Sequence, residues 1–153
     1  MLWLSADFSK DCSGIALWAG NVLANTYTVK VKGKLGKHVF AGQTYGSQVA
    51  AWQAAFTVWP RGALVYEGGL GHNMKTARIL AEHRGGVLML WRLWCSGPTI
   101  AANVKEWRRV ACETWPGLSW PADRERCKAT AVSLVKEHFG RDVSADEADA
   151  VLV

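Results

Sequence analysis

The chain has 153 residues, half of them hydrophobic, and its 18 Lys and Arg exceed its 13 Asp and Glu, which gives a net charge of +5. This length fits one domain, residues 1–153, with a core of its own, and the positive charge favours a polyanionic partner. The irregular spacing of the four cysteines argues against a zinc site, and the absence of a signal-type N-terminus or a membrane-length apolar run predicts a cytoplasmic protein with no membrane segment.

The first predicted element is a short buried strand from Leu2 to Phe8, which carries Asp7 near its carboxyl end. Moving an ionised carboxylate out of water costs several kcal/mol unless a partner or a metal compensates. Ser9 to Gly14 is turn-like and Ile15 to Ala19 predicts a second strand, so Asp7 lies at the mouth of a hairpin. A lone acid at such a position is more often a turn or cap residue. The rest of the chain decides between these interpretations.

A third strand, antiparallel to the second, is predicted from Val22 to about Lys32, because Gly20-Asn21 is typical of a two-residue turn. Its end alternates valines with lysines. Two interpretations remain open: an edge strand whose lysines prevent aggregation, or a stripe that contacts phosphates. The lysines concerned are Lys30, Lys32 and Lys34.

A second acid follows a second buried strand. Apolar residues spaced three or four apart predict a helix from Ser47 to Trp59, and a short apolar strand follows from Ala63 to Tyr66. Glu67 comes directly after this strand. The pattern seen at Asp7 is repeated here. Two acids that each follow a buried strand favour a shared functional site over two unrelated turn or cap residues.

The loop after Glu67 leads to a long predicted helix from about Asn73 to Cys95. Neither the glycines of this loop nor any other segment match a nucleotide-binding motif, so we expect no nucleotide cofactor. Gly85-Gly86 lies inside the helix, where each glycine costs roughly 1 kcal/mol relative to alanine, and we expect something to approach the backbone closely there. The predicted buried stripe contains Met74, Ala77, Ala81, Leu88 and Trp91.

The last third of the chain predicts a strand from Thr99 to Val104, a loop from Glu113 to Asp123 and a helix from Arg124 to Phe139. Ser144 and Glu147 form a capping-box pattern that begins a final helix. Two further acids, Asp146 and Asp149, lie three residues apart on one face of this helix. The order of strands and helices predicts an α/β layer fold.

Acids thus follow two core strands and share one face of the last helix. Such a group is mutually repulsive unless cations neutralise it, and oxygen-only ligation suits Mg²⁺ or Mn²⁺. A pair of such ions stabilises both the attacking water and the leaving oxygen of a phosphoryl displacement, which points to phosphodiester hydrolysis. The four acids are Asp7, Glu67, Asp146 and Asp149.

The ordered set of residues resembles the RuvC family of Holliday-junction resolvases, within the ribonuclease H-like nucleases, and above all its short phage-type members. The resemblance implies a ribonuclease H-like α/β fold: a mixed five-stranded sheet, with three antiparallel N-terminal strands and then parallel strands, flanked by helices. The matching pieces are Asp7 before a Ser/Gly turn, Tyr66-Glu67, Ala81 to Val87 with Arg84-Gly85, Val104-Lys105 and Asp146 to Ala150.

By position, the resemblance implies that the four acids bind Mg²⁺, or Mn²⁺, and catalyse nicking of branched DNA to give 5′-phosphate and 3′-hydroxyl ends. It also implies a homodimer formed through the long helix around Gly85-Gly86. Leu70 falls where the family can place an aromatic wedge, and Lys105 and Lys128 fall near its DNA-contacting lysines.

Two other functions remain open from the sequence. One is a ribonuclease H that acts on RNA–DNA hybrids. The other is a non-catalytic DNA-binding module whose acids are incidental caps, for which phosphate contacts alone would supply the affinity. His72, close to Glu67, is the one histidine that the sequence places near the chemistry.

Overall fold

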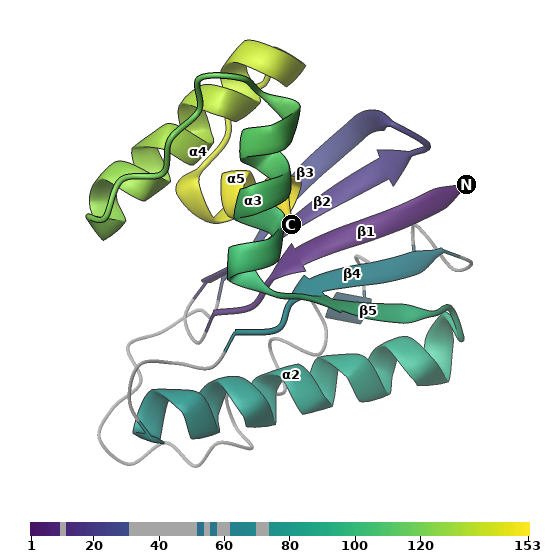
Figure 1. The fold of residues 1–153 in the computed structure, drawn as a ribbon. Coiled ribbons are helices and arrows are strands. Elements are labelled where there is room, and N and C mark those ends of the chain that lie inside the picture. Colours follow the sequence, from purple (N-terminus) through teal and green to yellow (C-terminus); the bar gives the residue numbers. More distant parts are fainter. Residues whose placement is uncertain (10–11, 31–51, 54–55, 58–61, 70–73) are drawn as a thin grey trace.

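The computed structural model describes residues 1–9, 12–30, 52–53, 56–57, 62–69 and 74–153 (Figure 1). The strands are β1 (Leu2–Asp7), β2 (Cys12–Ala19), β3 (Val22–Lys30), β4 (Ala63–Glu67) and β5 (Thr99–Ala102). The helices are α2 (Met74–Trp94), α3 (Val104–Thr114), α4 (Arg124–Phe139) and α5 (Ala145–Leu152).

The strands form one mixed sheet in the order β3-β2-β1-β4-β5. The pairs β1–β2 and β2–β3 are antiparallel, whereas β1–β4 and β4–β5 are parallel. Helix α2 lies on one side of the sheet, and α3, α4 and α5 lie on the other (Figure 1). The predicted α/β class and the five-stranded sheet with three antiparallel N-terminal strands are therefore confirmed.

Alternate residues of β2 enter two different cores. Ile15 and Leu17 pack in the cluster that contains Trp91 of α2, whereas Ala16 and Trp18 pack in the cluster formed with α4 and α5. Successive side chains of a strand point to opposite faces, and both faces are covered here. This explains why β2 has an almost continuous apolar sequence.

The first hairpin is longer than predicted, because β2 begins at Cys12 rather than at Ile15. Ser13 Oγ accepts a hydrogen bond from Ser9 N at 3.1 Å. The two strands are therefore already linked at Ser13, two residues before the predicted start of the second strand. The next residue, Gly14, pairs with Asp7 across the hairpin. The predicted continuation of β3 to Lys32 lies outside the described residues.

Helix α2 agrees with the predicted bounds to within one residue, but its predicted buried stripe is wrong at two positions. Met74 is 88 % exposed and Ala81 is also exposed. The first turns of α2 extend past the ends of β1 and β4 (Figure 1), so helical periodicity there does not correspond to contact with the sheet. Leu88 does pack against the core. The buried residues of this helix and its end are His83, Val87, Trp91 and Cys95.

Gly85 lies on the exposed side of α2. A Cβ built on Gly85 would meet no atom of the described chain within 4 Å. The close approach that we expected at this glycine therefore has no partner within the described part of the protein.

The sequence prediction missed α3. The strand predicted from Thr99 to Val104 ends at Ala102, and the side chain of Asn103 then caps a helix by accepting a hydrogen bond from Lys105 N at 2.9 Å. Trp107 and Ala111, four residues apart, form its buried side. An Asn cap before this spacing is the signal that could have revealed the helix.

Helices α4 and α5 agree with the prediction. Asp123 caps α4 by accepting from Arg126 N at 2.9 Å, and Gly140 ends it in the left-handed conformation with φ of 65°. In α5 both hydrogen bonds of the capping box between Ser144 and Glu147 are present. These boundaries are local, which is why the sequence alone predicts them.

Part of the predicted helix from Ser47 to Trp59 is described. Residues 52–53 and 56–57 are helical, and Trp52 and Phe56 are fully buried, as their spacing predicted. The remainder of that helix lies outside the described residues. Across the described ranges, no helix has the length and apolarity needed to cross a membrane.

Candidate active site

The register of the parallel strands brings two acids to one edge of the sheet. Ala6 of β1 pairs with Tyr66 of β4, so Asp7 and Glu67 follow at the carboxyl ends of neighbouring strands. Each acid lies an even number of residues from Trp3 or its partner Ala63, and therefore extends from the same face. Trp3 packs against the cluster formed with α4 and α5. Both acids thus face the side of the sheet that α5 covers.

A glycine lets α5 approach this edge. Gly14 pairs with Asp7 on one side and with Thr28 on the other. A Cβ on Gly14 would lie 1.8 Å from the carbonyl oxygen of Asp146, so the first turn of α5 rests directly on the backbone of β2. Thr28 Oγ1 and Ser144 Oγ share a hydrogen bond of 3.3 Å beside this contact. Close packing at Gly14 therefore brings the acids of α5 to the end of β1.

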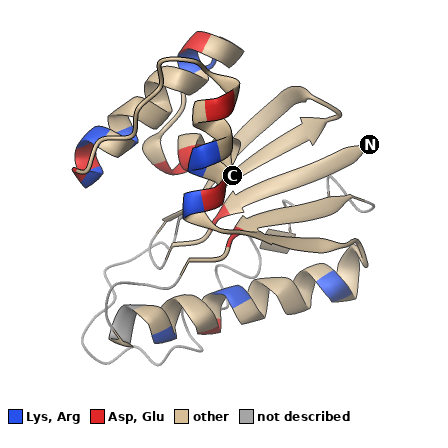
Figure 2. Cartoon of the chain, viewed as in Figure 1, with Lys and Arg blue, Asp and Glu red and all other residues tan. Residues whose placement is uncertain are grey.

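The acids interact electrostatically, as expected if they share one site. Burial first, and then the charges of Glu67, Asp149 and Asp146 in that order, raise the pKa of Asp7 from its ordinary 3.8 to about 7. The pKa of Asp149 rises to about 6, again through burial first and then through Glu67. Figure 2 shows the acidic segments at the ends of β1 and β4 and on α5 gathered in the middle of the molecule. The structure therefore brings all four predicted acids together.

Glu67 has more partners than the sequence suggested. Burial raises its pKa, while Trp107, Arg108 and Arg84 lower it. Trp107 Nε1 donates a hydrogen bond to Glu67 Oε2 at 3.4 Å. Arg84 Nη2 donates to the Gly69 carbonyl at 2.8 Å, which fixes the start of the loop that follows Glu67.

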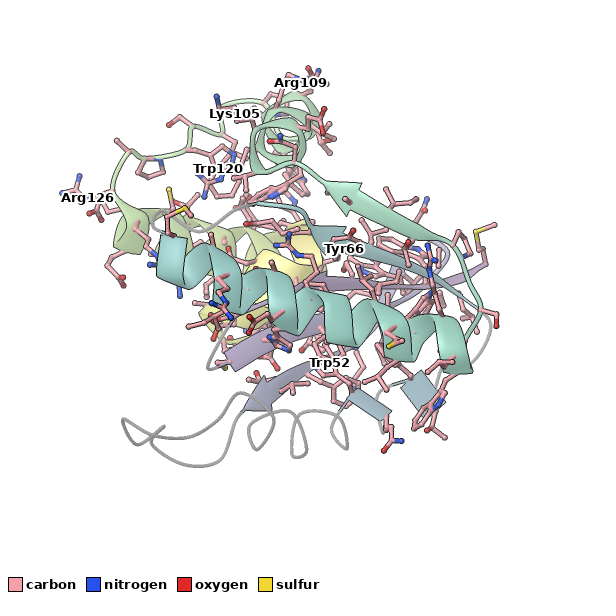
Figure 3. The ribbon with its side chains drawn as sticks, turned by 90° about the horizontal axis from the view of Figure 1, so that it is seen from below. Trp52, Tyr66, Lys105, Arg109, Trp120 and Arg126 are labelled. Carbon is pink, nitrogen blue, oxygen red and sulfur yellow. The ribbon has the colours of Figure 1, made fainter. Side chains whose placement is uncertain are left out.

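The predicted DNA-contacting lysines have different surroundings. Lys128 Nζ lies 3.4 Å from Asp146 Oδ1, so this lysine contacts one of the acids. Lys105 is exposed on the first turn of α3, and Figure 3 shows it above Trp120. Lys30 ends β3. The other predicted site residues, Lys32, Lys34 and Leu70, lie outside the described residues, as does His72.

The donor set fits a divalent cation in chemistry and charge. Carboxylate oxygens are the ligands that Mg²⁺ and Mn²⁺ prefer, and repulsion from the other acids adds to burial in raising the pKa of Asp7. As placed, however, no three acidic, histidine or cysteine side chains of the described residues form a group that could hold an ion. A full ligand set therefore requires movement of these side chains.

Sequence reasoning also missed a buried histidine. His83 of α2 is 4 % exposed, and its Nδ1 donates to the carbonyl oxygen of Ser9 at 3.1 Å, two residues after Asp7. Burial lowers its pKa. Its four-residue spacing from Val87 and Trp91 is the sequence signal that could have placed it on the buried side of the helix.

Comparison with known proteins gives matches in structure only. No protein-family model matches the chain, and a sequence comparison with curated proteins gives no match. A structure of Thermus thermophilus RuvC is similar with a TM-score of 0.71 and 15 % identity, and a structure of T. thermophilus RuvC in complex with a Holliday junction substrate is similar with a TM-score of 0.69 and 14 % identity. Each likeness covers 100 % of this chain and 90 % of the other. The chain therefore has the RuvC fold, and the resemblance stated from the sequence is confirmed at the level of fold.

Proposed function

We propose that this chain, which has the RuvC fold, is a divalent-metal-dependent endonuclease that nicks branched DNA such as Holliday junctions. One observation carries the proposal: acids from β1, β4 and α5 meet at one sheet edge, where burial and mutual repulsion hold the pKa of Asp7 at about 7. A protein keeps so costly a group of acids where function requires it. The T. thermophilus protein whose fold it shares is described in complex with a Holliday junction substrate.

In this proposal Asp7, Glu67, Asp146 and Asp149 hold Mg²⁺ or Mn²⁺. Bound cations would supply an activated water and would stabilise the leaving oxygen of the phosphodiester. The residues of the chain orient the reactants: Trp107 holds Glu67 by its N–H, and Lys128 offsets the charge of Asp146. The expected products carry 5′-phosphate and 3′-hydroxyl ends.

The DNA is proposed to lie over α3 and the start of α4, beside the acids. Basic segments of α3 adjoin the acidic centre in Figure 2, and Lys105 extends from the first turn of α3 in Figure 3. The net charge of +5 supplies the general attraction. The predicted contacts of Lys30, Lys32, Lys34 and Leu70 with DNA remain part of the proposal.

We also propose that two copies pair through the exposed side of α2. Gly85, Met89 and Leu93 recur at four-residue spacing on this side, and Met89 and Leu93 are 66 % and 67 % exposed. An apolar stripe at helical spacing suits a second helix, and an uncovered glycine permits close approach. The double change Met89→Glu and Leu93→Glu should convert a dimer to a monomer in sedimentation, whereas Val22→Glu, at a site 67 % exposed on β3, should not.

Cleavage of a panel of DNAs tests the proposed function. The panel contains a four-way junction, a fork, a linear duplex and an RNA–DNA hybrid, each with and without Mg²⁺. We expect Mg²⁺-dependent nicking of the junction, complete loss of nicking in Asp7→Asn, and junction binding that survives in this variant. Asp142→Asn is the matched control, because Asp142 is 86 % exposed and pairs only with Lys136 among the described residues.

Other outcomes would replace the proposal. Preferential cutting of the hybrid would indicate a ribonuclease H. Salt-sensitive binding without cleavage under any metal condition would indicate a non-catalytic DNA-binding module. Normal cutting by Asp7→Asn would mean that the acids are wrongly assigned.

A further inference from the structure

One arginine beside the acids packs against two tryptophan rings that also contact each other. The guanidinium carbon of Arg108 lies 5.3 Å from the ring centre of Trp107 and 5.1 Å from that of Trp120. The two rings meet edge to face, with centres 5.2 Å apart and planes at 89°. Each cation–π contact is favourable, and together they stabilise the observed orientation of the side chain. Arg108 is therefore positioned before any ligand arrives.

This assembly is tied to the site through hydrogen bonds. Trp120 Nε1 donates to the carbonyl oxygen of Arg108 at 3.2 Å, and Trp107 Nε1 donates to Glu67 Oε2 at 3.4 Å. Trp120 comes from the segment between α3 and α4, and Figure 3 shows it between these two helices. The position of the arginine is thus coupled to the position of a proposed catalytic acid.

Arg108 differs from the other cations near the acids. Arg84 donates to the carbonyls of Gly68 and Gly69, and Lys128 pairs with Asp146. Within the described part of the chain, Arg108 forms no side-chain hydrogen bond or ion pair, and its buried Nε has no partner. Its charge nevertheless lowers the pKa of both Glu67 and Asp149. Its guanidinium therefore lies close to the acids but donates no hydrogen bond to them.

We propose that Arg108, packed against Trp107 and Trp120, binds the non-bridging oxygens of a DNA phosphodiester at the cleavage site. The inference deepens the proposed nuclease function and rests on it. A planar guanidinium donates two parallel hydrogen bonds to a phosphate, which a lysine cannot do. A side chain that the rings already hold loses little rotamer freedom on binding. Arg108 is then a catalytic residue that seats the phosphodiester against the acids.

A double-mutant cycle between protein and DNA tests this inference. Binding of a four-way junction is measured in EDTA, in the Asp7→Asn background, so that neither metal nor cleavage affects the result. Single phosphates near the junction are replaced in turn by neutral methylphosphonates. With Arg108 present, one position should weaken binding about 10- to 100-fold. With Arg108→Met, binding to unmodified DNA should be weaker by a similar factor, and that position should have no further effect.

Arg109→Met is the matched control. Arg109 adjoins Arg108 on α3 but is 65 % exposed and pairs with Glu113. It should leave the effect of the methylphosphonate unchanged. Arg108→Lys keeps the charge and should recover only part of the affinity, because its single ammonium lacks the paired donors.

The inference would be overturned if the loss of affinity from Arg108→Met simply added to the loss from each methylphosphonate. Full affinity of Arg108→Met for unmodified DNA would also overturn it. Thermal melting of each variant identifies any that fail to fold, in which case Arg108→Lys carries the same cycle. The result is separable from the proposed function. If the wild-type chain cuts no substrate, the cleavage proposal fails, but the binding measurements still test the contact between Arg108 and the phosphate. If cleavage occurs without the coupling, only the role of Arg108 fails.

Discussion

Under α2, large rings fill the core beside the sheet, whereas under the first turn of α5 the sheet contacts helix backbone at Gly14. The rings on that second face, Trp3 and Trp18, stack on each other, and Trp18 meets Phe139 of α4. On the first side, Trp91 meets Phe56 edge to face with ring centres 5.1 Å apart. On the second side, Gly14 leaves no room for even a Cβ below Asp146, and Ala148 is fully buried. Large apolar side chains contribute most to the free energy of folding, and small ones permit close approach. The α2 side should therefore govern stability, and the α5 side the position of the acids.

The largest expected effect is on the α2 side. Trp91→Ala removes a fully buried ring and the hydrogen bond from its Nε1 to Gly97, and should lower the free energy of unfolding by about 3–5 kcal/mol. Urea unfolding measures this loss, and Trp94→Ala, at a site 43 % exposed on the same helix, should cost far less. Junction cleavage by the folded fraction should change little. If Trp91→Ala lost cleavage while still folded, the α2 side would also determine activity, and the proposed difference between the two sides would be wrong.

Asp7→Asn should stabilise the protein at pH 8 without divalent cations, by up to about 4 kcal/mol. The pKa of Asp7 is raised from 3.8 to about 7, mainly by burial. The unfolded chain therefore releases this proton near pH 4 and the folded chain only near pH 7, so the wild type loses stability across that interval as the pH rises.

Urea unfolding at pH 4, 6 and 8 checks this prediction. The difference between Asp7→Asn and the wild type should be absent at pH 4 and largest at pH 8, and Mg²⁺ should reduce it by binding the ionised acids. Asp142→Asn, at a site 86 % exposed, should show no such trend. Equal stabilities of Asp7→Asn and the wild type at pH 8 would show that the ionised Asp7 does not destabilise the folded protein.

Gly14→Ala should affect activity more than stability. The added Cβ must displace α5, with an expected cost of about 1–3 kcal/mol in unfolding free energy and a roughly 100-fold slower cleavage, because small displacements of catalytic groups are costly. Gly20→Ala is the matched change: no described atom lies within 4 Å of its Cβ, so only its positive φ of 61° should cost stability, and cleavage should be unaffected. Full cleavage by a folded Gly14→Ala protein would show that α5 need not rest on β2.

The smallest expected effect concerns the cap of α5. Ser144→Ala removes the acceptor for Glu147 N and the hydrogen bond with Thr28, and should cost about 1 kcal/mol. Asp123→Ala removes the corresponding cap of α4 at a similar cost. Only the first should slow junction cleavage, by a factor of a few, since of these two helices α5 alone carries acids of the proposed site. Equal slowing by both would indicate a general loss of stability.

The parts of the molecule that the sequence predicted depend on local signals. Asp7 and Glu67 each follow an apolar strand, and the capping box of Ser144 fixes the start of α5. Parallel pairing of β1 and β4 then brings the two strand-end acids together. Strand periodicity and helix caps act over a few residues, so they can be read without the fold.

The parts that the sequence did not predict depend on contacts between distant residues. No local sequence signal shows that the backbone of Asp146 packs on Gly14, or that Trp107 donates a hydrogen bond to Glu67. Periodicity identified α2 but not where along the helix contact with the sheet begins, which is why Met74 was misplaced. The two tryptophans around Arg108 are separated by a turn and come together only in the folded chain.

The place of α5 in the chain has a consequence for biosynthesis. Asp146 follows Glu67 by 79 residues, which takes a ribosome roughly 4–16 s at the usual rate of 5–20 residues per second. The five strands of the described sheet have been made by the time α5 is translated, yet Asp7 and Glu67 cannot meet the acids of α5 until that helix has emerged. A growing polypeptide therefore cannot assemble the whole acidic group while its sheet is still forming.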